Sequence, residues 1–415
     1  MALMTVSDAL AAVLANVEPV AEEMIALHGA WHRVLARDVG ARRTQPPQAM
    51  SAMDGYAVRS VDATKVDTQL KLIGEVAAGR PFAGSVAAGQ AVRIFTGGVI
   101  PDGADAVVIQ EDTIAEGNLV TIKEAAISGR HIRPAGVDFR EGDVLLTRGT
   151  WLTERDLSLA AGMNHPQLPV RRRPKVAILA TGDELVMPGA TPSAGQIIVS
   201  NGYALHALAR AEGADTIDLG IAADTMEATK SGIRRARESG ADILITTGGA
   251  SVGDHDLVKP ALEAEGFSLA FWKIAMRPGK PMMFGQHTAP LDASLDASLG
   301  AMRVMGLPGN PVSSYICGFL YMVPLIRALS GRSTIHHRRE TAVLGCDVRA
   351  NDVREDYLRA RLEEREDGAL VATPLDLQDS SLLANLAAAQ ALVVRAPFAP
   401  KASAGSNCLV LRLPI

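Results

Sequence analysis

The chain has 415 residues, of which 48 % are hydrophobic and only 4 % aromatic, and its formal net charge is −5 at pH 7. This length predicts about two to four domains. The acidic balance argues against nucleic-acid and membrane-surface binders.

We expect a cytoplasmic protein. Cys317, Cys346 and Cys408 are scattered and show no pairing pattern, which is typical of reduced thiols. No apolar run reaches the length of a transmembrane helix, so no membrane association is expected. The N-terminus also lacks the basic start and the cleavage site of a signal peptide.

The first 170 residues mix helical and β-like patterns. Apolar spacing predicts a helix over 7–17 with Ser7 as its N-cap, a helical or mixed stretch over 31–39, and a helix over 152–161. Between them, from about residue 53 to 138, short β-like runs alternate with glycines, at 71–76, 91–95, 106–110 and 119–122. We therefore predict a mixed N-terminal domain formed by 1–44 and 139–170, with a β-rich domain of residues 45–138 inserted into it.

Residues 171–330 alternate strands and helices. Strands are predicted at 176–180, 216–221, 243–247, 268–274, 282–284 and 304–307, and helices at 201–211, 227–238, 257–265 and 312–329. This order implies an α/β domain with a doubly wound, mainly parallel sheet. Arg171-Arg-Arg-Pro174 is interpreted as a solvated linker at its entrance, and the tandem Leu-Asp-Ala-Ser repeat at 291–298 as a surface-loop expansion.

Residues 331–415 return to short strands, predicted at 341–348, 357–362, 370–374, 391–395 and 409–413. They indicate a compact, barrel-like all-β C-terminal domain. His336 and His337 are interpreted as a solvated pair in the linker that leads to it.

The most informative segment follows the apolar run 243–247 and reads Gly248-Gly-Ala-Ser-Val-Gly-Asp-His-Asp256. Gly248, Gly249 and Gly253 allow the backbone to approach a ligand and to turn its N–H groups toward an anion. Asp254 and Asp256 add oxygens that suit a hard cation such as Mg²⁺. The loop therefore predicts a metal together with a phosphorylated or oxyanionic substrate.

Three further loops follow predicted strands: Thr-Gly-Asp-Glu at 181–184, Arg-Pro-Gly-Lys-Pro at 277–281 and Gly-Leu-Pro-Gly-Asn-Pro at 306–311. Ligands of open α/β sheets bind beyond the carboxyl ends of the strands, so we expect all four loops at one edge. Pro311 begins a helix whose N-terminus can bind anions, and Arg277 and Lys280 add cations. One such loop would be an ordinary turn; four together favour a site.

Motif absences narrow the function. The chain has no GxxxxGK[ST], which argues against an ordinary NTPase, and no HExxH. Its nine histidines show no metal-ligand spacing, and His255 alone is a weak signal.

Taken together, the motifs resemble those of the MoeA family, the molybdopterin molybdenumtransferases related to the gephyrin E domain. The resemblance rests on Ser-Ala-Met-Asp-Gly-Tyr-Ala at 51–57, Arg-Ile-Phe-Thr-Gly at 93–97, Pro-Asp-Gly-Ala-Asp-Ala-Val-Val at 101–108, and the four loops above, in the family's order. It implies the last step of molybdenum cofactor synthesis, in which adenylylated molybdopterin and molybdate react, AMP is released, and Mg²⁺ or another divalent cation assists.

The resemblance also implies an elongated homodimer of four-part subunits. Its active site would lie between the α/β domain of one subunit and the β-rich domain of the other. Contacts with molybdopterin adenylyltransferase and with recipient molybdoenzymes are further expected partners, and nucleic acid is not.

The loop motifs and the resemblance together assign two groups of positions. The catalytic group is Asp54, Thr96, Glu184, Asp224, Asp256 and Lys280, with Glu184 and Asp256 as metal ligands. The substrate-binding group is Asp138, Gly182, Asn201, Gly248, Gly249, Ser251, Gly253, Lys273, Arg277, Pro308, Gly309, Asn310 and Pro311.

The sequence departs from the family pattern at a few positions. Ala250 replaces a common Val. Arg277 replaces a common Lys, and the planar guanidinium of the arginine would bind an oxyanion differently. Val199-Ser-Asn201 replaces a more polar tripeptide and leaves Asn201 as the expected ligand contact.

Two alternatives stay open. A molybdopterin adenylyltransferase-like enzyme would need only the part of the chain around 171–330, and Asp54 and Thr96 disfavour it. A gephyrin-like scaffold would need partner-binding linkers, and the chain has no long disordered segment. No dedicated nucleophile is evident, and none is needed if molybdate oxygen or water attacks the phosphate.

Overall fold

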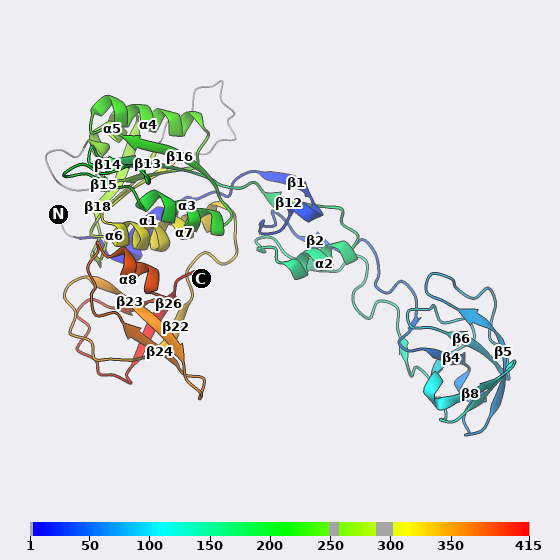
Figure 1. Cartoon of the computed structure of the whole chain (residues 1–415). Coiled ribbons are helices and arrows are strands. Elements are labelled where there is room, and N and C mark those ends of the chain that lie inside the picture. Colours follow the sequence, from blue (N-terminus) through cyan, green and yellow to red (C-terminus); the bar gives the residue numbers. More distant parts are fainter. Residues whose placement is uncertain (1–2, 249–256, 288–301, 415) are drawn as a thin grey trace.

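A computed structural model describes residues 3–248, 257–287 and 302–414. Figure 1 shows an elongated molecule in which the α/β domain and the C-terminal domain lie together at one end and the β-rich domain lies at the other. A small middle domain joins the two ends and is built from β1 (Glu22–Ala26), β2 (Val39–Gly40), β11 (Val144–Leu146), β12 (Gln167–Arg171) and α2 (Glu154–Gly162).

The α/β domain is built on a six-stranded sheet with the order β16-β13-β17-β21-β20-β18. The first four strands, β16 (Asp215–Ala222), β13 (Lys175–Thr181), β17 (Ile243–Thr247) and β21 (Arg303–Leu307), are parallel. Strand β20 (Pro281–His287) runs antiparallel to β21 and to β18 (Phe267–Lys273). The sheet is thus mainly parallel, as predicted, with one reversed strand near its edge because a short loop links β18 to β20.

Helices cover both faces of this sheet. Alternate residues of β13 point to opposite cores: Val176 and Ile178 pack with α3 (Asn201–Ala211), α6 (Pro311–Cys317) and α7 (Val323–Leu329). Ala177 and Leu179 pack with α4 (Met226–Glu238) and α5 (Val258–Ala264). Successive side chains of a strand point to opposite faces, so a strand with helices on both faces contributes to two cores. These two helix layers confirm the doubly wound prediction.

The helix after β21 is continuous from Pro311 to Leu329, with a π-helical turn at Gly318–Met322 between α6 and α7. Its 19 residues are long and apolar enough to span a membrane by composition, contrary to our expectation that no such run exists. However, 89 % of its most apolar stretch is buried within the chain. Its composition reflects its position in the largest core.

The N-terminal region differs from its prediction in two places. Helix α1 (Val6–Leu14) is capped by Thr5, whose hydroxyl accepts the Asp8 N–H, so Ser7 is not the cap. The buried side chains of α1 pack into the α/β core. Residues 31–39 form no helix, because His32 has a φ of 56° and Val34 and Leu35 make isolated bridges to Trp151 and Val170.

The middle domain has little regular structure. Strand β1 (Glu22–Ala26) pairs with β12 (Gln167–Arg171), and β2 (Val39–Gly40) pairs with β11 (Val144–Leu146). Helix α2 (Glu154–Gly162) begins with a capping box between Thr153 and Asp156 and packs on the same small core. The predicted helix over 152–161 is therefore confirmed.

The β-rich domain is a six-stranded sheet of order β7-β4-β6-β5-β9-β8. Its strands are β4 (Gly55–Val58), β5 (Gln69–Val76), β6 (Gln90–Ile94), β7 (Ala106–Ile109), β8 (Thr113–Glu116) and β9 (Leu119–Ile122). The short pair β3 (Met50–Ser51) and β10 (Ile132–Arg133) lies where the chain enters and leaves the domain.

The C-terminal domain is a closed five-stranded barrel. Its strands are β22 (Arg339–Leu344), β23 (Glu355–Glu364), β24 (Leu370–Pro374), β25 (Ala391–Arg395) and β26 (Asn407–Arg412), and the β23–β25 pairing closes it. Strand β19 (Met276–Arg277) extends from the α/β domain and pairs with β23. Helix α8 (Leu383–Ala388) was not predicted.

Two charged segments are more structured than the sequence suggested. Arg172 forms a bidentate pair with Asp242, at 2.7 and 2.8 Å, so the arginine run anchors the entrance of the α/β domain and is no solvated linker. His337 stacks on Phe319 with ring centroids 3.8 Å apart, and its Nε2 lies 2.6 Å from the Phe319 carbonyl oxygen. Only His336 of the histidine pair is exposed.

Candidate functional site

The predicted loops meet at one edge of the α/β sheet. In the parallel register, Thr181 lies beside Ala222, and Thr247 lies beside Leu307. Because β20 is reversed, its first residue Pro281 pairs with Lys273, the last residue of β18. The segments after β13, β16, β18 and β21, and Gly248 after β17, therefore start at the same edge, which confirms the expectation for the loops at 181–184, 277–281 and 306–311.

Glu184 and Gly182 form a compact unit after β13. Gly182 has a φ of +146°, and a Cβ at this position would lie 2.4 Å from Glu184 Oε2. The glutamate side chain therefore folds over the glycine, and its carboxylate stays exposed to solvent. Without a side chain at position 182, the acid can lie directly over the strand end.

Asp224 joins the loop after β16 to the loop after β13. Its Oδ2 accepts the Asp183 N–H at 3.3 Å, and its own N–H donates to Asp183 Oδ1 at 3.0 Å. Both residues are exposed. These two hydrogen bonds hold the loop that carries Glu184 against the loop after β16. The structural role of Asp224 is therefore to position the Glu184 loop. Sequence reasoning placed Asp183 in the loop and did not single it out as a partner.

Gly248, Gly309 and Asn201 hold the centre of the edge together. Gly248 has a φ of +91°, and a Cβ there would lie 2.4 Å from the Thr181 carbonyl oxygen. Asn201 Nδ2 donates to the Gly309 carbonyl oxygen at 2.7 Å. The start of α3 and the loop before α6 are thereby fixed to each other.

The proline-bearing loop before α6 also contacts the C-terminal domain. Asn310 Nδ2 donates to Ser380 Oγ at 3.0 Å, and the Val312 N–H donates to the Ser380 carbonyl oxygen at 3.0 Å. Pro311 occupies the first turn of α6, as predicted, and Pro308 is buried. The Asn310 side chain thus has a structural partner in the barrel.

The three predicted cations have different surroundings. Arg277 forms ion pairs with Asp352 and, at 3.3 Å, with Asp356, both in the C-terminal domain. Lys280 is exposed, Lys273 is half-buried, and neither has an ion pair within the described part of the chain. Lys280 and Lys273 are therefore the better candidates for an anion, while Arg277 fastens the barrel to the edge.

Asp54 and Thr96 come together on the β-rich domain. Asp54 Oδ1 accepts the Thr96 N–H at 2.7 Å and the Thr96 hydroxyl at 2.8 Å. These two donors, with the backbone N–H first, lower the pKa of Asp54. Close packing sets the loop: a Cβ on Gly55 would lie 2.1 Å from the Val108 carbonyl oxygen.

Arg93 supports this pair. In the sequence it was part of the motif at 93–97 and was not predicted as a site residue. Its guanidinium lies over the rings of Tyr56 and Phe95, 5.0 and 4.8 Å from the centroids. It also donates to the Gly55 carbonyl oxygen at 3.0 Å. A fixed positive charge thus lies beside the Asp54 carboxylate and contributes to the lowering of its pKa.

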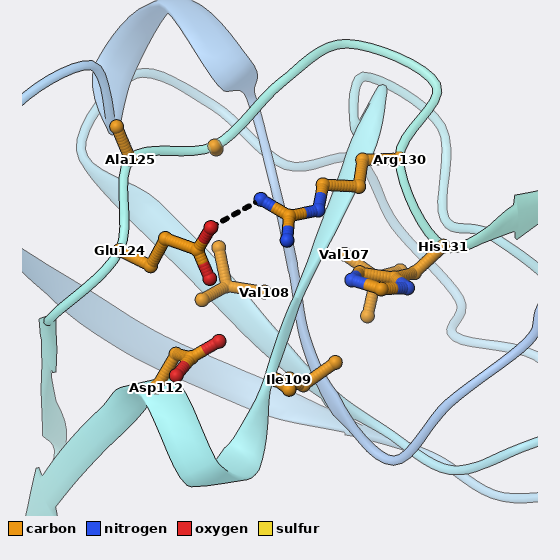
Figure 2. A pocket seen from close by; sticks show the side chains of 9 residues that line it. Val107, Val108, Ile109, Asp112, Glu124, Ala125, Arg130 and His131 are labelled. Carbon is orange, nitrogen blue, oxygen red and sulfur yellow. Dashed lines mark hydrogen bonds and ion pairs between the residues drawn. The ribbon is translucent and has the colours of Figure 1, made fainter.

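A small pocket lies near the Asp54 loop, lined by Asp112, Glu124, Arg130 and His131 (Figure 2). Arg130 and Glu124 form an ion pair at 2.5 Å, and the hydrogen bond that the protonated Asp112 carboxyl donates to Glu124 raises the pKa of Asp112. The His131 carbonyl oxygen accepts the Ala52 N–H at 2.8 Å. With a volume of about 10 Å³, the pocket has room for about one water molecule and is too small for a substrate. We therefore interpret its lining residues as structural support for the loop that carries Asp54.

The remaining predicted positions are less informative. Asp138 is exposed, and its N–H donates to the Gln45 carbonyl oxygen at 3.1 Å where the two chain segments pass into the β-rich domain. Gly249, Ser251, Gly253 and Asp256 lie outside the described residues. Within the described residues, no three His, Cys, Asp or Glu side chains gather in a way that could hold a metal ion.

One chain does not bring the two halves of the predicted site together. Figure 1 places the β-rich domain, to which Asp54 and Thr96 belong, at the opposite end of the molecule from the α/β domain, to which Glu184 and Lys280 belong. The middle domain separates them. Each half therefore presents its polar groups without the other.

Three family models match in succession along the chain: the MoeA N-terminal region (domains I and II) at 4–163, the probable molybdopterin binding domain at 177–328, and the MoeA C-terminal region (domain IV) at 341–413. The chain belongs to the MoeA family. The molybdopterin molybdenumtransferase of Nostoc sp. is 35 % identical over 398 residues, covering 95 % of this chain and 89 % of that protein.

Further relatives agree. The molybdopterin molybdenumtransferase of Haemophilus influenzae is 34 % identical, with 94 % of each chain covered. The crystal structure of the molybdopterin biosynthesis MoeA protein from Pyrococcus horikoshii OT3 superimposes with a TM-score of 0.83 at 25 % identity, covering 99 % of this chain and 100 % of that one. The MoeA fold therefore extends over the whole chain.

Proposed function

We propose that this chain is a molybdopterin molybdenumtransferase, an enzyme of molybdenum cofactor biosynthesis. It inserts molybdenum from molybdate into adenylylated molybdopterin and releases AMP. The observation that carries this proposal is the pairing, in one MoeA-type chain, of an anchored Asp54–Thr96 unit with a sheet edge that presents Glu184, Asn201 and Lys280. An adenylyltransferase-like enzyme would have no use for the first of these.

The sheet edge suits a nucleotide-linked pterin. Gly182 and Gly248 keep the loops at this edge compact, because a Cβ at either position would clash with the Glu184 carboxylate or with the Thr181 carbonyl oxygen. Lys280 and Lys273 supply positive charge for phosphate or molybdate, and Asn201 fixes the loop between them and Glu184. Positive groups at this position stabilise the negative charge that develops when the bond to AMP breaks.

Glu184 and Asp256 would hold a divalent cation, most simply Mg²⁺. The exposed Glu184 carboxylate over Gly182 fits such an ion, because Mg²⁺ is commonly bound by one or two carboxylates together with substrate phosphates and water. When bound, the cation neutralises phosphate charge. Asp224 contributes by holding the Glu184 loop in place.

The separation of the two half-sites favours a homodimer with composite sites. Asp54 and Thr96 of one subunit would complete the sheet edge of the other, because the β-rich domain and the α/β domain lie at opposite ends of one chain (Figure 1). Contacts with a molybdopterin adenylyltransferase and with recipient molybdoenzymes, in the cytoplasm, fit the same proposal.

The test supplies the purified chain with adenylylated molybdopterin, molybdate and Mg²⁺ and measures AMP release and active cofactor. AMP release that requires molybdate supports the proposal. Two parallel reactions separate the alternatives: molybdopterin with ATP tests adenylyltransferase activity, and omission of molybdate tests simple hydrolysis. AMP formation that ignores molybdate would overturn the proposal.

A further inference from the structure

A pocket of about 510 Å³ lies where three domains meet. Gly149, Thr150 and Trp151 of the middle domain form one wall, and the segment after α7 forms the second. Glu340 and Arg412 of the barrel form the third. This volume is within the usual range of small-molecule sites, roughly 300–1,000 Å³.

This pocket is distinct from the sheet edge of the α/β domain. The helix from Pro311 to Leu329 begins at that edge and ends next to the pocket, and its 19 residues span about 28 Å. No residue assigned to the molybdenumtransferase site lines the pocket.

The lining is strongly cationic. It contains Arg327, Arg332, Arg338 and Arg412, and one acid, Glu340. Arg412 pairs with Glu340 at 2.9 Å. Arg327 and Arg332 share a single carboxylate, that of Glu212, at 2.7 and 2.9 Å. Because Arg338 has no ion pair within the described part of the chain, four guanidinium groups face two carboxylates and leave an excess of two positive charges.

Arg332 is held in place before any ligand arrives. The Arg332 guanidinium lies 3.4 Å from the centroid of the Trp151 ring, and Arg332 Nη2 donates to the Glu212 carbonyl oxygen at 2.9 Å. Its Nε is buried and has no hydrogen-bond partner within the described residues. Burial lowers the pKa of Arg332 to about 10, still well above neutral pH, so a fixed charge stays partly desolvated. Such a charge favours an anionic ligand over bulk water.

We propose that this junction binds a small anion of the diphosphate class, at a site separate from the molybdenumtransferase centre. Guanidinium groups match phosphate oxygens with paired N–H donors, and two excess positive charges suit a ligand with more than one anionic group. Since the pocket walls come from three domains, the bound anion also holds these domains together.

The test is calorimetric titration of the full chain with pyrophosphate at constant ionic strength. It uses a Lys280→Ala background, which removes the exposed lysine of the sheet edge. In this background Arg338→Ala is expected to weaken binding about tenfold, the loss of one charge-assisted contact. Arg338→Lys should restore part of it. Arg365→Ala, which removes an exposed arginine of the same barrel outside the pocket, is the matched control and should change nothing.

Glu340→Gln gives a prediction of opposite sign. Removing this carboxylate frees Arg412 and raises the net positive charge, so pyrophosphate should bind several-fold more tightly. Inorganic phosphate should bind more weakly than pyrophosphate in every variant. The proposal is overturned if Arg338→Ala and Glu340→Gln both bind as the background does, or if phosphate, pyrophosphate and added chloride compete equally. Circular dichroism of each variant separates a lost site from a lost fold.

Discussion

The Asp54 carboxylate accepts both the backbone N–H and the hydroxyl of Thr96 on a single oxygen, Oδ1. This double contact leaves Oδ2 outside the pair. The β-rich domain thus carries a charged acid in a fixed position. The low pKa that follows from the Thr96 donors keeps this acid ionised.

We predict that Thr96→Val lowers kcat/KM for molybdate-dependent AMP release roughly tenfold, a size typical of small misplacements of a reacting group. Valine keeps the branched shape and the backbone N–H contact but removes the hydroxyl donor. Asp54→Asn, which keeps the shape and loses the charge, should cost more. Thermal unfolding of both variants should match the wild type; an unaltered rate in Asp54→Asn would exclude a role for the charge.

The composite site can be tested by mixing inactive chains. Asp54→Ala and Glu184→Ala chains damage different halves, so in a mixed dimer one site carries both lesions and the other is intact. Random exchange of equal amounts should therefore recover about one quarter of wild-type activity, since half of the dimers are mixed. Native mass spectrometry confirms that mixed dimers form. Full inactivity in their presence would mean that each site is built within one chain.

Much of this architecture is predictable because local patterns determined it. Strand β17 and helix α3 occupy the predicted residues, and the loops at one sheet edge follow from the parallel order alone. The closed C-terminal barrel follows from evenly spaced short strands. In each of these regions, apolar periodicity and burial agree.

The features that the sequence did not indicate are contacts between residues that are distant in sequence. Arg172 forms an ion pair with Asp242, seventy positions away, and Arg277 forms ion pairs with Asp352 and Asp356 in another domain. His337 is covered by Phe319, which no local pattern indicates. The clasp between Asp183 and Asp224 depends in the same way on the neighbouring positions of β13 and β16 in the sheet.

Glu184→Ala and Asp256→Ala are predicted to abolish molybdate-dependent AMP release without unfolding the chain. Glu184 is exposed on a glycine-supported loop, so its removal leaves no buried cavity. Asp183→Ala is the informative comparison: it removes one half of the clasp with Asp224 and should lower activity only partly. A titration with Mg²⁺ distinguishes the roles, because only the loss of a metal ligand should shift the metal dependence. Wild-type turnover of Glu184→Ala at limiting Mg²⁺ would remove it from the site.

His337 makes stability depend on pH. Burial lowers its pKa from 6.5 to about 4, so between these values the unfolded chain binds a proton that the folded chain excludes. The contribution of His337 to stability is therefore complete above about pH 6.5, decreases as the pH falls toward 4, and amounts to at most about 3 kcal/mol.

The measurement is the midpoint of thermal unfolding from pH 4 to pH 7.5. His337→Gln keeps a donor for the Phe319 carbonyl oxygen but cannot titrate, so its midpoint should decline less on acidification than that of the wild type. His336→Gln is the exposed control and should follow the wild type. Parallel curves for all three proteins would contradict the assignment.

Lys280 and Arg277 lie three residues apart, and we predict that their removal affects different properties: anion binding for Lys280 and stability for Arg277. Lys280 is exposed, has no ion pair within the described residues, and follows Gly279, whose φ of +110° and tight contact with Cys317 fix the turn. Loss of its charge-assisted contact should cost about 1.5–3 kcal/mol of anion binding, or roughly a ten- to hundred-fold loss of apparent affinity. Arg277, paired with Asp352 and Asp356, should contribute mainly to the attachment of the barrel.

Titrations of molybdate at fixed adenylylated pterin, and of pterin at fixed molybdate, separate these roles. In Lys280→Met, a shift in the molybdate titration alone places the lysine at the oxyanion, and a shift in the pterin titration alone places it at the phosphates. Arg277→Met should leave both titrations near the wild type while lowering the unfolding temperature, because its removal strands the buried Asp356 carboxylate without its partner. If Lys280→Met leaves the apparent affinities for molybdate and pterin unchanged, the lysine is only a surface residue. If Arg277→Met weakens molybdate binding without loss of stability, the ion pairs of Arg277 open on substrate binding and Arg277 belongs to the site.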